Sequence, residues 1–155
     1  MPNQELITEL SLAEEALRRA LSALIEASNR YCATFPQSVK DGLPSYAESK
    51  SNVSAAYYMY ATALSYVLTS AEKTLASLSP LAQKATEVQE VNVAERCADI
   101  IRAYEQFSAD ALSPYFEESQ AILHASANSI ALSPLYQATK KLSLRSEEFL
   151  KHLFS

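Results

Sequence analysis

Apolar residues recur at helical spacing in the first part of the chain, over residues 4–32. They step alternately by three and four residues: Leu6, Leu10, Ala13, Leu17, Ala20, Leu24, Ala27 and Tyr31. This spacing places one apolar stripe along one helix face and is typical of antiparallel bundles and coiled coils. We expect a helix here, with Glu14 and Glu15 pairing with Arg18 and Arg19 one turn later on its polar face.

A second helix is expected over residues 45–78. A loop over residues 33–43 precedes it and contains Gly42, the single glycine, which marks a turn with unusual backbone angles. Pro44 suits the first turn of the new helix. The apolar stripe again steps by threes and fours, through Val53, Tyr57, Tyr60, Leu64, Val67, Ala71, Leu75 and Leu78.

Three Leu-Ser-Pro tripeptides punctuate the rest of the chain, ending at Pro80, Pro114 and Pro134. Serine is a favourable N-cap and proline a favourable first helical residue, so each tripeptide predicts a helix start. The expected helices cover residues 80–112, 114–131 and 134–153.

Two alternatives remain within this region. Val88, Val91 and Val93 lower the helix propensity, and Asn92 with Glu95 would form a capping box that restarts the helix. The second and third prolines would otherwise kink a helix rather than end it.

These segments together predict an all-α fold. We expect a mostly antiparallel four- or five-helix bundle with three long helices and a Pro-broken C-terminal helical pair. The length of 155 residues predicts a single helical-bundle domain spanning residues 1–155.

The most informative feature is a stretch of twenty-one residues without a charge, over residues 51–71. A helix on the outside of a bundle normally carries Lys and Glu on its wet face, so we expect most of this circumference to be covered. The face opposite the apolar stripe is rich in tyrosine and hydroxyl groups: Ala55, Tyr58, Thr62, Ser65 and Thr69, with Tyr66 on its flank. These six residues are the candidate partner-binding site.

A second stretch, over residues 119–139, also lacks formal charge apart from His124 if that side chain is protonated. One interpretation is that the two uncharged stretches pack against each other inside the bundle. The other is that the far face of the second helix meets another chain, because interfaces are enriched in Tyr and depleted in Lys and Glu.

Overall charge and cysteine usage narrow the function classes. The net charge of −5 disfavours a nucleic-acid partner, and the local basic group Lys140, Lys141, Arg145 and Lys151 is interrupted by Glu147 and Glu148. Cys32 and Cys97 have no metal-ligand spacing, and the main expectation is that both are reduced. A disulfide between them would require Cα atoms within about 7 Å.

The ends and the uncharged stretches give no targeting signal. The N-terminus has neither a basic region nor an apolar one, which excludes a secretory signal peptide and leaves a cytoplasmic location or delivery without such a peptide. The first uncharged stretch is long enough to span a bilayer, but Asn52, its four tyrosines and its hydroxyl residues predict no membrane span.

No catalytic, cofactor or metal site is expected. The two histidines, His124 and His152, lack the Glu-x-x-His spacing of bundle metal centres. A single glycine excludes a Gly-rich phosphate loop, and neither cysteine has a base nearby in the sequence.

Two short stretches resemble known helical families. Arg145 and His152, seven residues apart, resemble the Arg-x(4–6)-His motif of the higher-eukaryote-and-prokaryote nucleotide-binding nucleases, as does the run Ala56-Tyr57-Tyr58. This resemblance implies an Arg/His-type helical ribonuclease.

Residues 44–69 resemble the second helix of the small helical exosome-cofactor family. The residues that carry this resemblance are Pro44, Lys50, Asn52, Val53, Ala56, Tyr57 and Tyr66. It implies a small RNA-processing cofactor, although the basic character and the tail of that family are missing here.

The sequence therefore favours a non-enzymatic protein–protein interaction module, such as an adaptor, an assembly subunit or a secretion- or effector-type domain. It would bury its uncharged Tyr/Ser/Thr face against another protein or a second copy of itself. The alternatives are the two RNA-related families above and a bundle that binds a small ligand through tyrosine hydroxyls.

Overall fold

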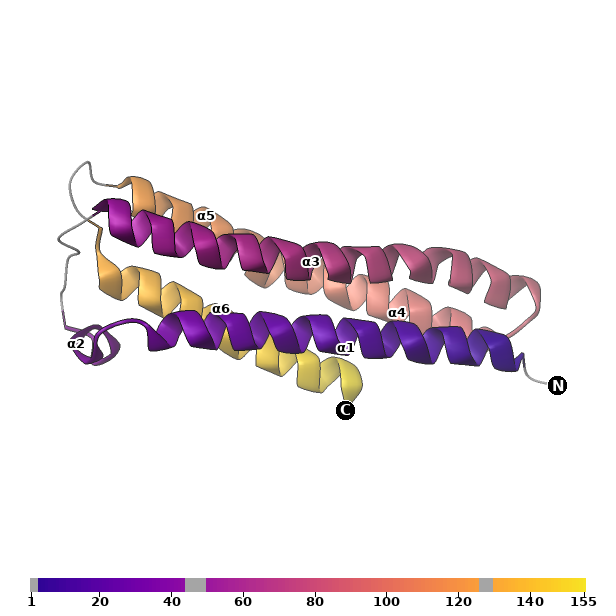
Figure 1. Ribbon diagram of the computed structural model, residues 1–155. Coiled ribbons are helices and arrows are strands. Elements are labelled where there is room, and N and C mark those ends of the chain that lie inside the picture. The colour runs from indigo at the N-terminus through magenta and orange to yellow at the C-terminus, as the bar shows by residue number, and fades with distance from the viewer. Residues whose placement is uncertain (1–2, 44–49, 126–129) are drawn as a thin grey trace.

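The computed structural model describes residues 3–43, 50–125 and 130–155, and these form an antiparallel helical bundle. Four rods run up and down along one long axis (Figure 1). They are α1 (Gln4–Ala33), α3 (Lys50–Glu87), a continuous rod of α4 (Val91–Phe107), η1 (Ser108–Leu112) and α5 (Ser113–His124), and α6 (Leu132–Phe154). The short α2 (Gln37–Lys40) follows α1. The expected all-α bundle is confirmed.

The predicted apolar stripes of the first two helices form the core. Leu17, Leu24, Tyr57 and Leu64 are completely buried, and the remaining stripe residues are buried or half-buried. Gly42 has a φ of 84°, as its turn requires. The start of α3 expected at Ser45, and the role expected for Pro44, lie outside the described residues.

The first Leu-Ser-Pro prediction is wrong, because α3 continues through Pro80 to Glu87. Pro80 is exposed, so its ring displaces no core side chain. Leu78, Leu81 and Ala85 are buried on the face that packs in the bundle. Their tertiary packing therefore outweighs the local signal for a new helix.

The chain reverses at residues 88–90 instead. Gln89 has a φ of 62° and α4 begins at Val91. Asn92 lies inside that first turn, so the Asn92–Glu95 capping box is not what starts the helix. The carboxylate of Glu90 accepts a hydrogen bond of 2.9 Å from the backbone N–H of Asn3, which connects this turn to the start of α1.

The second Leu-Ser-Pro tripeptide does not begin a separate helix. The rod runs from α4 into α5 through the π-helical turn η1, in which the N–H of Ser113 donates to the carbonyl of Ser108. Pro114 has no N–H to offer the carbonyl of Asp110 four residues earlier. Arg145 of α6 donates to that carbonyl instead, at 2.6 Å. Of the expected alternatives, proline within a distorted continuous helix is the correct one here.

The third tripeptide lies at a helix start, but α6 begins at Leu132 with Ala131 as its N-cap, so Ser133 is not the cap and Pro134 is the third helical residue. The predicted helix over residues 114–131 ends earlier, at His124, and residues 126–129 lie outside the described part.

Near the C-terminal end of α6, side-chain contacts connect this helix with α1 and α4. Arg96 of α4 donates to the carbonyl of Leu153 at 2.7 Å and pairs with Glu14 of α1 at 3.3 Å. The predicted Glu14–Arg18 pair is therefore replaced by one between helices. Arg18 and Arg19 both pair with Glu15, and Arg18 also lies over the ring of Phe154.

Replacing Pro80 with Ala should stabilise the protein. The substitution restores an N–H for the carbonyl of Ala76 in an exposed helix interior, so the free energy of unfolding should rise by about 1–3 kcal/mol. Pro134→Ala is the matched control, because Pro134 sits in the first turn of α6 and a missing N–H costs little there. Urea unfolding followed by circular dichroism measures both. Equal effects of the two substitutions would contradict this account of Pro80.

Candidate functional site

The predicted partner-binding residues lie on the outer face of α3 and are all exposed: Ala55, Tyr58, Thr62, Ser65, Tyr66 and Thr69. Tyr58 is 44% exposed and Tyr66 is 77% exposed. The hydroxyl of Tyr58 reaches Gln120 of α5 at 3.4 Å, and this is the edge of the cover that α5 provides. The bundle therefore leaves most of the predicted face open.

A neighbouring row of α3 is also exposed, and Tyr66 is its only member among the predicted partner-binding residues. It consists of Ala56, Met59, Ala63, Tyr66 and Ser70, and Met59 is 76% exposed. Its four- and three-residue steps resemble those of the buried stripe, and the sequence alone gave no reason to separate this row from the core. Both rows together form what we term the α3 face.

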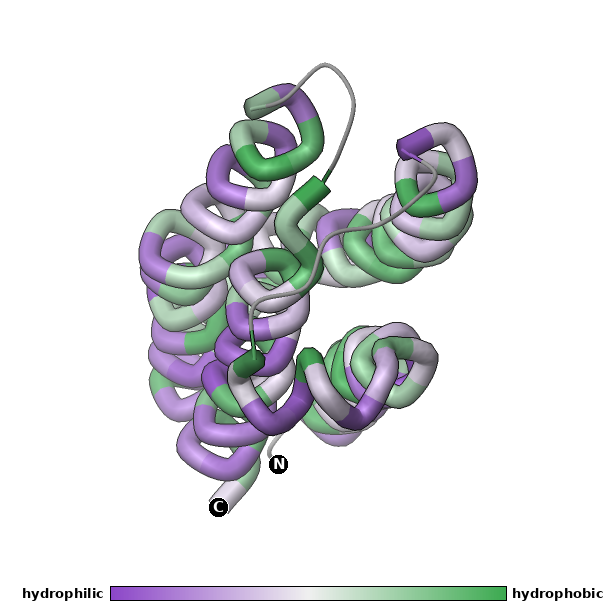
Figure 2. The backbone as a smooth tube through the Cα atoms, turned by 90° about the vertical axis from the view of Figure 1, so that its left-hand side faces the viewer, coloured by the Kyte–Doolittle hydropathy of each residue, from purple (hydrophilic) through white to green (hydrophobic). Residues whose placement is uncertain are grey.

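The α3 face concentrates exposed apolar surface. Of the eight large exposed apolar side chains in the described residues, Tyr58, Met59 and Tyr66 lie within one nine-residue segment. Viewed along the bundle from the α2 end, the turns of α3 nearest the viewer are mostly pale or green after its first residues (Figure 2), and the charged residues of this helix from Glu72 onward lie farther along it. Exposed apolar groups that gather on one face mark interaction surfaces more often than scattered ones do.

A buried tyrosine cluster supports this face from beneath. Three tyrosine hydroxyls pair with small hydroxyl side chains on other helices: Tyr57 with Ser119 at 2.5 Å, Tyr60 with Ser28 at 2.9 Å, and Tyr115 with Thr139 at 2.8 Å. All six side chains are buried, and they come from α1, α3, α5 and α6. The second uncharged stretch thus contributes Ser119 and Thr139 to the cluster that packs under the first.

The rings of this cluster fill the space between α3 and α5, whose backbones stand apart in Figure 2. Tyr31 stacks on Tyr60 with ring centroids 4.4 Å apart, and Tyr60 contacts Tyr115 edge-on at 6.4 Å. The ligand-binding alternative needs a pocket in this place. The tyrosine rings lie in this place, with their hydroxyls bonded to Ser119, Ser28 and Thr139.

Burial keeps these hydroxyls protonated. It raises the pKa of Tyr60 to about 12 and raises those of Tyr31, Tyr57 and Tyr115 above their ordinary value. Neighbouring tyrosines raise the pKa values further, because a tyrosinate would add negative charge to a poorly solvated space. The cluster consists of neutral hydrogen-bond donors and acceptors and supplies no base near neutral pH.

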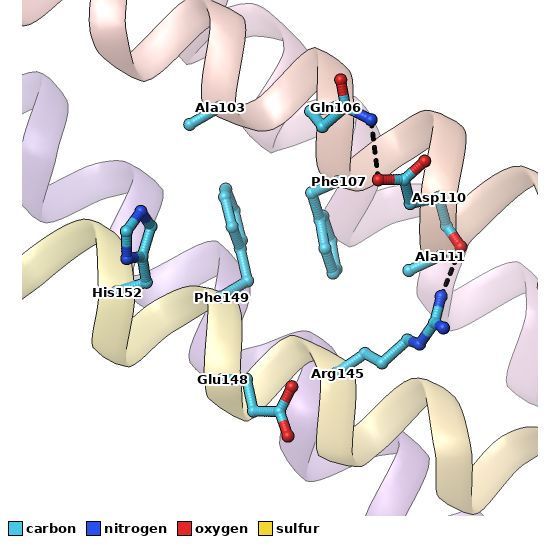
Figure 3. Close-up of a pocket in the computed structure, with 9 residues that line it drawn as sticks. All are labelled: Ala103, Gln106, Phe107, Asp110, Ala111, Arg145, Glu148, Phe149 and His152. Carbon is cyan, nitrogen blue, oxygen red and sulfur yellow. Dashed lines mark hydrogen bonds between the residues drawn. The ribbon is translucent and has the colours of Figure 1, made fainter.

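A second candidate is an open groove of about 670 Å³ between α6 and the α4–η1 rod (Figure 3). Phe107 and Phe149 stack in it with ring centroids 4.4 Å apart and planes 2° from parallel. Gln106, Asp110, Arg145, Glu148 and His152 complete the lining. The two residues of the nuclease-like motif therefore do share one face of α6 and one groove.

The chemistry of this groove does not match a ribonuclease centre, however. Arg145 points away from His152 and binds the carbonyl of Asp110, while Asp110 accepts from Gln106 at 2.7 Å (Figure 3). The carboxylates of Asp110 and Glu148 add negative charge where a phosphate would have to bind. We assign Arg145 to the structural role of satisfying the carbonyl that Pro114 leaves free.

The two cysteines and the potential metal ligands form no further candidate site within the described residues. Cys32 and Cys97 are both free; they lie near opposite ends of the bundle, and burial raises the pKa of each thiol. The described residues contain no group of three His, Cys, Asp or Glu side chains placed to hold a metal ion. Over the same part of the chain, no helix is long and apolar enough to cross a membrane.

Comparison with known proteins adds no relative: no protein family model, curated protein or solved structure matches the chain.

Two Tyr→Phe substitutions should distinguish a buried hydroxyl that has a hydrogen-bond partner from one that has none. Tyr60→Phe leaves the completely buried Ser28 without its partner and should lower the free energy of unfolding by about 1–3 kcal/mol. Tyr104 is similarly buried, but its hydroxyl has no partner among the described residues, so Tyr104→Phe should be neutral or stabilising by up to about 1 kcal/mol. Urea titrations at neutral pH measure both. Equal losses would contradict the role given to the hydroxyl pairs.

Removing the Arg145 guanidinium should destabilise the π turn. Arg145→Ala should lower the free energy of unfolding by about 1 kcal/mol, because the exposed carbonyl of Asp110 loses a charged donor. Glu148→Ala is the control from the same helix and groove. Chemical unfolding and a labelled-RNA cleavage assay test the two roles. An RNA-cleaving activity lost in Arg145→Ala and His152→Ala, with stability unchanged, would support the nuclease instead.

Proposed function

We propose that this protein is a non-enzymatic interaction module that binds a helix of a partner protein along the α3 face. The observation that carries the proposal is the exposure of Tyr58, Met59 and Tyr66 within twenty-one residues that contain no charge. Binding there removes apolar and hydroxyl surface from water without stripping any charged side chain of its hydration.

The dimensions of the face fit a helical partner. Twenty-one helical residues extend about 30 Å, so a partner helix of about twenty residues would match the face along its whole length. The rows through Tyr58 and Met59 lie side by side, so together they can form both walls of a shallow helix-binding surface. Small residues such as Ala55 and Ala63 allow a second helix to approach closely between the larger side chains.

The expected partner segment is an amphipathic helix with an aliphatic and hydroxyl-rich face. Aliphatic side chains would contact Met59 and the tyrosine rings, and hydroxyls would pair with Thr62, Ser65 or Thr69. A partner face with Lys or Glu at its centre would be rejected, because this surface offers those charges no counter-charge.

The tyrosine cluster underneath favours a rigid surface. Tyr57 and Tyr60 fix the inner side of the same helix through hydrogen bonds to α5 and α1. A surface that is already ordered loses less conformational entropy on binding, which leaves more of the contact energy as affinity.

Site-specific photo-crosslinking tests the proposal in cells of the source organism. A photoreactive amino acid replacing Met59 should give a discrete adduct, and an excess of the untagged wild-type protein should compete it away. The Met59→Lys and Thr62→Lys variants should compete at least about tenfold less well, since each places a charge in the contact. Both positions are exposed, so the two variants should unfold like the wild type.

The same probe at Leu144 is the control, because that side chain is 50% exposed on α6 and lies outside the α3 face. The proposal fails if position 59 gives no adduct. It also fails if position 144 gives the same adducts, or if the lysine variants compete as well as the wild type.

A further inference from the structure

The outer side of the α1–α3 pair carries a second surface, towards the end of the bundle away from α2. Two hollows line the junction of these helices, with volumes of about 430 and 310 Å³. The first lies beside Tyr66 and the second beside Leu12. Ala16 borders both, so they form one groove, which we term the α1–α3 groove.

Each hollow has a large exposed side chain at its edge. Leu12 is 66% exposed and Tyr66 is 77% exposed. An apolar side chain that projects beside a hollow of matching size is a feature of self-complementary surfaces, in which a projection of one copy enters the hollow of the other.

The charges of the groove are arranged with opposite signs about its centre. Glu9 borders one hollow and Arg19 the other, with Ala16 and Leu12 between them. Suppose that α1 of a second copy packs antiparallel on α1 of the first. In the register in which the numbers of two facing residues add up to 28, Glu9 of one copy meets Arg19 of the other. The same register places Leu12 against Ala16 of the second copy.

The α3 helices satisfy the same two-fold arrangement. Residues whose numbers sum to 147 then face each other, so Tyr66 lies over Leu81 of the second copy and Ser70 over Ser77. Leu81 and Ser77 both line the 310 Å³ hollow, which therefore receives the Tyr66 ring. One antiparallel register thus pairs opposite charges and places both projecting side chains over the groove of the second copy.

We infer that the protein forms a two-fold symmetric homodimer through the α1–α3 groove, in this antiparallel register. The contact from Glu5 to Ala23 extends about 28 Å and is two helices, or about 20 Å, wide. That footprint is about 560 Å² on each copy, or about 1,120 Å² in total, just above the roughly 1,000 Å² that a biological interface should clear. α3 ends at Glu87, so in this register Met59 has no α3 residue of the second copy opposite it, and the part of the α3 face before residue 60 stays open for another protein. Tyr66 and Ser70 belong to both surfaces.

Charge reversal tests this register. The wild type should be a concentration-dependent dimer in sedimentation equilibrium or in size-exclusion chromatography with light scattering. Glu9→Arg or Arg19→Glu alone should raise the dimer Kd at least about tenfold, because a two-fold contact contains each charge pair twice. The double variant, with both charges exchanged, should return the Kd to within about threefold of the wild-type value.

Three further variants complete the test. Leu12→Lys should give a monomer that unfolds like the wild type, because its side chain is exposed in a single copy. Met59→Lys and Arg102→Glu should leave the Kd unchanged, since the first lies outside the register and the second on the far side of α4. A monomeric wild type, single variants that dimerise normally, or a double variant that stays monomeric would each overturn the inference. None of these results depends on whether the α3 face binds another protein.

Discussion

The hydroxyl pairs of the buried tyrosines are the interaction on which the rest of this bundle depends. Around α5 the α4–η1–α5 rod stands apart from α3 (Figure 2), and tyrosine side chains reach across the space between them. Tyr57, Tyr60 and Tyr115 are long enough to do so, but each carries a hydroxyl that must be satisfied when it is buried. Ser119, Ser28 and Thr139 satisfy them from three other helices. Those six residues therefore determine the separation of the helices and the direction in which α3 faces outward.

The π turn changes the phase of the rod's buried face just before α5. An extra residue at Ser108–Leu112 shifts the helix phase, so that Ala111, Tyr115, Ser119 and Leu123 continue the buried face at four-residue steps after the mixed steps of α4. Pro114 leaves the carbonyl of Asp110 without its helical donor, and Arg145 supplies one from α6. A residue that resembles part of a nuclease motif is thereby accounted for by the local geometry of the helix.

The lack of charge over residues 51–71 of α3 follows from two separate causes. On the inner side the tyrosine cluster leaves no room for a charged side chain, and the raised pKa values of its members show how poorly that space solvates an ion. On the outer side no element of the described chain covers Met59 or Thr62, so the bundle itself does not require the absence of charge there. That difference is the physical reason for assigning the outer side to a partner.

The sequence by itself determined the helical class, the buried stripes of α1 and α3, the Gly42 turn and the start of α6. Those features depend on periodicity and on residues such as glycine whose backbone preference is local. Only the tertiary structure decided the rest. Pro80 stays inside a helix because the buried residues around it pack against α1 and α4. Pro114 stays inside a helix because Arg145, thirty-one residues later, donates a hydrogen bond to the carbonyl of Asp110, which Pro114 cannot reach with an N–H. The exposure of the predicted residues Tyr58, Thr62 and Tyr66 was also decided there, since a row of hydroxyls and aromatics at helical spacing suits a core and an interface equally well until the neighbouring helices are placed.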